Sequence, residues 1–130
     1  MPRVTVVNDN PEFLALVDDL LKMEDYETTL VDGDRGEALD RIRASRPDVL
    51  MIDLRLGSEG LHGWDIAQEV RADPELRGTP ILICSADTMA LDMLHEEFEG
   101  ARDVAELTKP FDIDDLYAAI EGLLEPTTPT

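Results

Sequence analysis

The sequence predicts an α/β fold built around a parallel sheet, and two patterns carry that prediction. Short apolar runs alternate with amphipathic segments of about helix length, which favours successive βα units over a sandwich. Four of the runs end on a polar side chain, as expected where the carboxyl ends of parallel strands form a site. With 130 residues, 43% of them hydrophobic, the chain has the size and the core of one domain.

The apolar runs predict five strands, at residues 4–7, 28–31, 49–52, 81–84 and 104–107. A first helix should begin at Asn10-Pro11-Glu12, because proline suits the first helical position, and end near Met23. A second helix is expected over 36–42, before Pro47. Three more helices should follow the third, fourth and fifth strands, which gives five βα units.

Apolar residues at helical spacing indicate which side of each helix faces the core. They are Phe13, Val17, Leu20 and Leu21; Ala38, Leu39 and Ile42; Ile66, Ala67 and Val70; Leu91, Leu94 and Phe98; and Ile113, Leu116, Ile120 and Leu123. We expect residues 1–124 to form the domain and residues 125–130 to be a disordered polar tail, since that segment is rich in proline and threonine.

The composition excludes several classes of protein. A formal net charge of −19 opposes binding to nucleic acid or to an anionic membrane and favours a partner with basic patches. Cys84 is the only cysteine, so an intramolecular disulfide or a cysteine cluster for zinc is impossible. It lies within an apolar run, where a core role is expected. Without a signal region or a membrane-spanning stretch, the chain is expected to be cytoplasmic.

Polar residues at the ends of four strands predict a site for phosphoryl chemistry. Asp9 and Asp53 supply two carboxylates, Ser85 supplies a hydroxyl and Lys109 supplies an ammonium. Two carboxylates suit a hard cation such as Mg²⁺, whereas a hydroxyl and an ammonium suit phosphoryl oxygens. A single aspartate after a strand is more often a turn residue or a helix cap, so the prediction depends on the four residues together.

Four segments together resemble the receiver domain of two-component response regulators: Val6-Val7-Asn8-Asp9-Asn10-Pro11-Glu12, Pro47-Asp48-Val49-Leu50-Met51-Ile52-Asp53-Leu54, Ser85-Ala86 and Lys109-Pro110-Phe111. The resemblance covers nearly the whole chain, with one motif at each of four strand ends. It implies a flavodoxin-like doubly wound fold, in which five helices flank a five-stranded parallel sheet of strand order 2-1-3-4-5.

The resemblance also implies a role for each site residue. Asp53 would be the nucleophile that accepts a phosphoryl group from a histidine kinase, a phosphotransfer protein or a small phosphodonor. Ser85 and Lys109 would hold the phosphoryl oxygens. The only chemistry implied is self-catalysed phosphoryl transfer and autodephosphorylation, so we do not expect a conventional enzyme.

The implied metal is Mg²⁺ or Mn²⁺, bound by Asp9, by Asp53 and by the backbone carbonyl of Arg55. Members of the family usually have two acidic residues after the first strand, whereas this chain has Asn8 followed by Asp9. Asn8 could still contact the metal through a water molecule, while removing one negative charge from the site. We therefore expect weaker Mg²⁺ binding than in a typical receiver.

Three further positions concern switching and tuning. Glu106 stands where the family usually has an aromatic side chain that turns inward on phosphorylation, and a carboxylate enters an apolar slot only at a large cost. Arg55 and Asp87 occupy variable positions beside the site, where they could form an ion pair or remain two solvated charges. The lengthened loop 54–62 could be a harmless insertion or could contact the metal or a kinase. Trp64 is expected to be half-exposed.

The leading prediction is a stand-alone receiver that signals to a downstream protein target, with no nucleic-acid or membrane partner, as a monomer or weak dimer. The alternative is a phosphorylation-independent interaction module that keeps the fold without the switch. An aspartyl phosphatase is disfavoured, because Arg55 stands where its second aspartate should be. A dinucleotide-binding enzyme is disfavoured because no Gly-x-Gly-x-x-Gly follows the first strand.

Overall fold

The computed structural model describes residues 2–32, 38–54, 62–87, 89–92, 103–109 and 111–124. Five strands and four helices have defined bounds in these ranges, namely β1 (Arg3–Asn8), α1 (Pro11–Met23), β2 (Glu27–Asp32), α2 (Ala38–Ser45), β3 (Val49–Asp53), α3 (His62–Ala72), β4 (Ile81–Ser85), β5 (Val104–Thr108) and α5 (Ile113–Leu124). Residues 89–92 are also helical, where the sequence predicts a helix between β4 and β5. Its other inward positions, Leu94 and Phe98, lie outside the described residues.

The strands form one parallel sheet in the order β2-β1-β3-β4-β5, as expected. In register, Val7 pairs with Ile52, Asp53 pairs with Cys84, and Ser85 pairs with Thr108. The carboxyl ends of β1, β3, β4 and β5 therefore lie along one edge of the sheet. This arrangement brings together the polar residues at the four strand ends.

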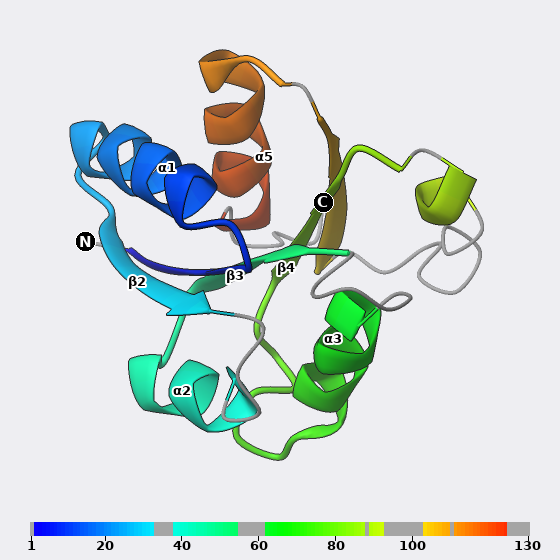
Figure 1. Cartoon of the computed structure of the whole chain (residues 1–130). Helices are drawn as coiled ribbons and strands as arrows, with labels where there is room; N and C mark the ends of the chain where they lie inside the picture. The colour runs from blue at the N-terminus through cyan, green and yellow to red at the C-terminus, as the bar shows by residue number, and fades with distance from the viewer. Residues whose placement is uncertain are drawn as a thin grey trace, which may run out of the picture.

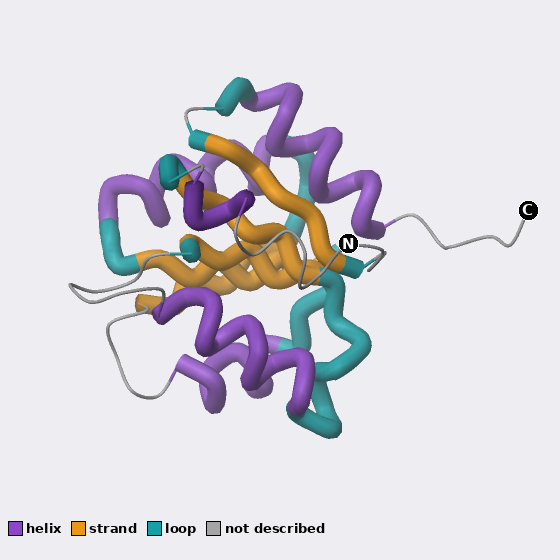
Figure 2. The backbone as a smooth tube through the Cα atoms, turned by 90° about the vertical axis from the view of Figure 1, so that its right-hand side faces the viewer, coloured by secondary structure: helices purple, strands orange, loops and turns teal. Residues whose placement is uncertain are grey.

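Helices cover both faces of the sheet, α1 and α5 on one face and α2 and α3 on the other (Figures 1 and 2). Side chains of β3 point alternately to the two faces of the sheet, so this strand contributes to the core on both sides. Val49 and Met51 pack under α1 and α5, whereas Leu50 and Ile52 pack against α2 and α3. This two-sided burial explains why the central strands are continuous apolar runs rather than alternating patterns.

Helix α1 begins and ends where the sequence predicts. The Asn10 side chain caps its amino terminus by accepting hydrogen bonds from the backbone N–H groups of Glu12 (2.9 Å) and Phe13 (3.3 Å). Pro11 follows at the first helical position, where no N–H partner is needed. Within the described ranges, no helix has both the length and the apolar character to cross a membrane.

Three expectations about individual elements are wrong in detail. Helix α2 continues to Ser45 instead of ending at Ile42, and the Ser45 hydroxyl forms a hydrogen bond of 2.6 Å with Thr5 in the sheet. Ile113, in the first turn of α5, is 46% exposed because it lines an open groove between α1 and α5 instead of the core. Trp64 is only 7% exposed and belongs to the core under α3.

Candidate phosphoryl site at the carboxyl edge of the sheet

Asn8, Asp53 and Lys109 extend toward the α1 and α5 side of the sheet. Each stands two residues beyond a side chain that packs in that layer, Val6, Met51 or Leu107. Because side chains alternate along a strand, residues two apart share a face. The strand period therefore places these polar groups on one side of the carboxyl edge.

Asp53 receives two hydrogen bonds on the same carboxylate oxygen. Lys109 Nζ lies 2.5 Å from Asp53 Oδ2 and forms an ion pair with it, and Asn8 Nδ2 donates to the same oxygen at 3.2 Å. The Asp53 side chain is 12% exposed and that of Lys109 is 23% exposed. Charge-assisted contacts in such a half-desolvated position are stronger than those on an open surface.

Asn8 is buried and has contacts on both ends of its amide. Its Nδ2 donates to Asp53, and its Oδ1 accepts from the backbone N–H of Asn10 at 2.8 Å. An aspartate at this position would lack the donor and would repel Asp53. The departure from the family pattern therefore creates a direct contact with Asp53, which the sequence did not reveal.

A cavity of about 380 Å³ opens beside Asp53, and its other lining residues are Ser85, Ala86, Asp87 and Lys109. Ser85 is buried, and its Oγ accepts a hydrogen bond of 3.0 Å from the Asp87 N–H. The Asp87 carboxylate accepts at 3.0 Å from the N–H of Ala90, so it caps the helical segment 89–92. Three strand ends thus surround one space with a carboxylate, a hydroxyl and an ammonium.

Gly63 lets helix α3 approach β3 closely. A Cβ atom at this residue would lie 1.7 Å from the Asp53 carbonyl oxygen and 2.8 Å from that of Leu54. The Gly63 N–H donates to the Leu54 carbonyl at 3.0 Å, and the Leu54 N–H donates to that of Cys84 at 3.0 Å. The backbone around Asp53 is therefore fixed by contacts that only glycine permits.

Cys84 is buried beneath the site, as the sequence predicts for a core residue. Desolvation raises the pKa of its thiol to about 12, with Lys109 lowering it and the Asp53 carboxylate raising it further. The thiol is therefore protonated at neutral pH and lacks the character of a nucleophile.

The remaining predicted residues have different placements. Asp9 follows Asn8 directly at the end of β1 and is half-buried. Glu106 is half-buried in β5, in register with Ile83. Arg55, with the expected carbonyl ligand and the possible ion pair to Asp87, lies outside the described residues. The loop 54–62 is described only at Leu54, which is buried, and in the backbone of His62, where α3 begins.

The donor chemistry at this edge fits a hard cation. The described residues contain no group of three or more His, Cys, Asp or Glu side chains arranged to hold a metal ion. Asp9 and Asp53 offer carboxylate oxygens, which suits Mg²⁺, an ion that keeps several water ligands and needs only one or two carboxylates. A zinc site would need nitrogen or sulfur ligands.

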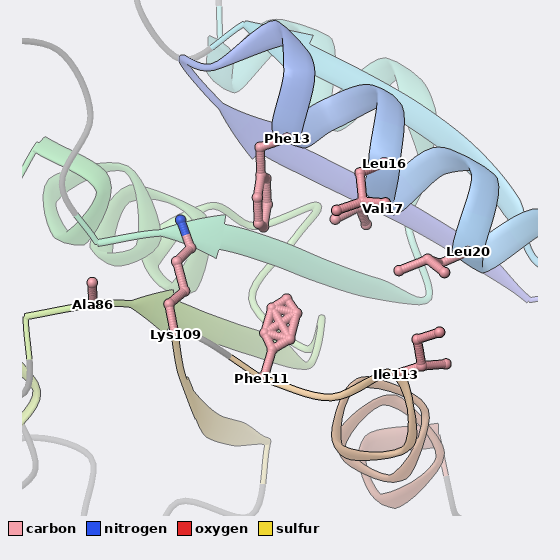
Figure 3. Close-up of a pocket in the computed structure, with 8 residues that line it drawn as sticks. All are labelled: Phe13, Leu16, Val17, Leu20, Ala86, Lys109, Phe111 and Ile113. Atoms are coloured by element: carbon pink, nitrogen blue, oxygen red, sulfur yellow. The ribbon is translucent and has the colours of Figure 1, made fainter.

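An apolar groove of about 520 Å³ between α1 and α5 adjoins this site (Figure 3). It shares Ala86 and Lys109 with the smaller cavity, and its other lining residues are Phe13, Leu16, Val17, Leu20, Phe111 and Ile113. Sequence reasoning assigned Phe13 to the core stripe of α1 and missed its contact with Lys109. No local pattern reveals that contact, because 96 residues of chain separate the two side chains.

Comparisons with known proteins match nearly the whole chain. The profile of the response regulator receiver domain family matches residues 4–121. A DNA-binding dual master transcriptional regulator of Synechocystis sp., RpaA, is 34% identical over 128 residues, covering 98% of this chain and 51% of RpaA. The DNA-binding response regulator MtrA of Mycolicibacterium smegmatis is 33% identical over 122 residues, covering 94% of this chain and 50% of MtrA. The chain thus spans about half the length of these regulators.

Solved structures show the same fold. The chemotaxis protein CheY4 of Vibrio cholerae superposes with a TM-score of 0.79 at 26% identity, covering 95% of this chain and 99% of CheY4. The receiver domain of the sensor histidine kinase PA1611 of Pseudomonas aeruginosa, which has a magnesium ion coordinated in its active site cleft, gives a TM-score of 0.75 at 27% identity, covering 95% and 97% of the two chains. The chain belongs to the response regulator receiver domain family of two-component signalling.

Proposed function

We propose that this receiver accepts a phosphoryl group on Asp53, from a histidine kinase, a phosphotransfer protein or a small phosphodonor, and signals through altered binding to another protein. One observation carries the proposal. Asp53, Ser85 and Lys109 come from three strand ends to line one cavity, and Lys109 Nζ lies 2.5 Å from Asp53 Oδ2. A nucleophile and two groups that bind phosphoryl oxygens thus share one space.

The chemistry needs little beyond positioning and charge. A carboxylate oxygen of Asp53 forms a bond to phosphorus while the bond from phosphorus to the donor nitrogen or oxygen breaks. The Lys109 ammonium and the Ser85 hydroxyl offset charge on the phosphoryl oxygens. Asp9 and Asp53 would hold Mg²⁺, whose chemistry is to neutralise the same oxygens. Attack of water on phosphorus then releases phosphate and restores the Asp53 carboxylate.

The apolar groove offers the phosphodonor protein a docking surface beside the cavity. The two spaces share Ala86 and Lys109, so a helix seated in the groove could present its phosphohistidine to Asp53. The two helices that form the groove also carry exposed acidic residues, namely Glu12 and Asp19 on α1 and Asp114 and Asp115 in the first turn of α5, with exposed Asp112 just before it. A helix with an apolar face and basic flanks is therefore the expected complement.

The output is proposed to be binding to a protein rather than to DNA. RpaA and MtrA are DNA-binding regulators, and this chain matches about half of their length. For the domain itself, the net charge of −19 opposes contact with phosphate backbones and favours a protein with basic patches. We propose that it acts as a stand-alone receiver in the cytoplasm, as a monomer or weak dimer. Size measurement of the phosphorylated and free forms tests the oligomeric state.

Intact mass spectrometry after incubation with a small acyl phosphate and Mg²⁺ tests the phosphorylation. We expect one phosphoryl adduct on the wild type and none on Asp53→Asn. Glu27→Gln, an exposed change at the opposite end of the strands, serves as the matched control and should keep the adduct. If the wild type takes no adduct at high Mg²⁺, nor from a panel of phosphorylated histidine kinases, a phosphorylation-independent interaction module becomes the better account.

A further inference from the structure

Lys109 contacts an aromatic ring as well as a carboxylate. Its Nζ lies over the ring of Phe13, 4.2 Å from the ring centroid (Figure 3). The same atom is 2.5 Å from Asp53 Oδ2. Attraction between an ammonium and the face of an aromatic ring strengthens as water is excluded. With the Lys109 side chain 23% exposed, this contact lies in the partly desolvated range.

The Phe13 ring is itself held in position by the start of α1. The backbone N–H of Phe13 donates to the Asn10 side chain at 3.3 Å, and the Asn10 N–H donates to Asn8 at 2.8 Å. On the groove side, Phe111 packs edge-on against Phe13, with ring centroids 6.3 Å apart and an interplanar angle of 81°. The ring thus has a defined orientation relative to Lys109 before any ligand binds.

Lysine needs such a support more than most cations. Its ammonium is a point charge on a flexible four-carbon chain, and it has no planar fork to fix its direction. Fixing that chain costs side-chain entropy, which each further contact helps to offset. Phe13 and Asp53 contact the ammonium together, so the ring favours the rotamers that keep Nζ at the candidate site.

We propose that Phe13 is a positioning residue for Lys109, which holds the ammonium against the phosphoacceptor by a cation–π contact. Its effect on phosphorylation rests on the proposed function, whereas its effect on the position of Lys109 does not. The aromatic face carries the role. A tyrosine therefore replaces Phe13, and a leucine of similar bulk does not.

Nuclear magnetic resonance of the lysine ε-methylene groups tests the contact directly. The chain has only two lysines, Lys22 and Lys109, and Lys22 is 62% exposed and paired with Asp18, so it serves as an internal reference. Protons over a ring face are shifted upfield. We expect the Lys109 ε-protons upfield of those of Lys22 in the wild type and in Phe13→Tyr, and the shift to be lost in Phe13→Leu.

Phe111→Leu is the matched control, because it makes the same substitution in the same groove at the ring that contacts Phe13 rather than Lys109. It should retain most of the upfield shift, because the Phe13 ring itself remains and its backbone is still fixed at the start of α1. Circular dichroism checks that each variant is folded. An upfield shift that persists in Phe13→Leu, or that Phe111→Leu removes equally, would overturn the proposal.

Rates of phosphorylation by a small acyl phosphate give the second measurement. Phe13→Leu should slow adduct formation by about three- to tenfold, the scale of one partly desolvated cation–π contact, and Phe13→Tyr should restore it. Equal rates for leucine and tyrosine would contradict the positioning role. If the wild type forms no adduct with the acyl phosphate or with phosphorylated histidine kinases, the proposed function fails. The resonance measurement still decides whether Phe13 holds Lys109 in position.

Discussion

Two aspartates of this protein pair with cations at opposite ends of the sheet, and their surroundings differ. Asp53 lies at the carboxyl edge and accepts hydrogen bonds from the side chains of Lys109 and Asn8. Asp73 follows α3 at the amino edge, and its Oδ2 accepts from Arg43 Nε at 2.7 Å while pairing with Arg43 Nη2 at 2.5 Å. Its Oδ1 accepts from the backbone N–H of Glu75 at 2.8 Å.

The two pairs differ in how easily the cation can leave its aspartate and bind another anion, such as a phosphoryl group. Arg43 contacts Asp73 through two nitrogens of its planar guanidinium. The Glu75 N–H also donates to Asp73 and is held in place by the turn. The pair therefore links α2 to the chain that follows α3. Lys109 holds Asp53 through one rotatable ammonium beside a cavity. An ion pair with aspartate therefore stabilises the fold at the amino edge, whereas at the carboxyl edge it leaves a cation that can bind a phosphoryl group.

Exchanging the two carboxylates for amides gives the largest expected contrast. Asp53→Asn should abolish the phosphoryl adduct entirely while the protein stays folded, since the amide keeps the size of the carboxylate and can still accept a hydrogen bond from Lys109. Asp73→Asn should keep the adduct but lower the melting temperature by about 3 to 6 °C, because the Arg43 fork loses its charged partner. Mass spectrometry and thermal unfolding of both variants check this. An Asp73→Asn protein that folds normally but takes no adduct would break the distinction.

Gly63→Ala should disturb the carboxyl edge through its backbone. The added Cβ would meet the Asp53 carbonyl at 1.7 Å, so we expect a loss of about 2 to 3 kcal/mol in the free energy of unfolding. Gly122→Ala is the control, because open space surrounds that position in α5, and it should stabilise by about 0.5 to 1 kcal/mol. Urea unfolding measures both, and equal effects would argue against a close approach at Gly63.

Asn8→Asp changes the charge beside Asp53. We expect Mg²⁺ to bind about three- to tenfold more tightly, because a third carboxylate beside Asp9 and Asp53 makes the local potential more negative and repels Asp53 when no cation is present. Asn10→Asp adds the same charge two residues away on an exposed helix cap, and it should tighten binding less. Calorimetric titration with Mg²⁺ measures both affinities, and no tightening in Asn8→Asp would contradict the expectation.

Low pH should weaken the ion pair between Arg43 and Asp73, and we expect this to be the smallest of the effects on stability. The hydrogen bonds from Arg43, and then from the Glu75 N–H, hold the pKa of Asp73 below its ordinary value. A lowered folded-state pKa contributes stability that is complete above the unfolded pKa, near about 4, and disappears as pH falls through the folded pKa. The difference in melting temperature between wild type and Asp73→Asn should therefore be constant from pH 7 to 5 and shrink below about pH 4.

The positions of the site residues could be predicted from the sequence because they depend on local pattern. The rule that the carboxyl ends of parallel strands meet at one edge predicted that Asp53, Ser85 and Lys109 lie together. The start of α1 followed from Asn10 and Pro11, whose side chains act within one turn of the chain. These are short-range effects, so adjacent residues are enough to specify them.

The partners of those residues were decided only by the tertiary structure. The contact of Lys109 with Phe13, the direct hydrogen bond from Asn8 to Asp53, and the burial of Trp64 join elements far apart in the chain. The sequence determined the fold class and which side chains reach the carboxyl edge, since alternation and strand order are properties of the backbone. Which atoms touch there depends on rotamers and on the distance between packed helices, which only the assembled layers fix.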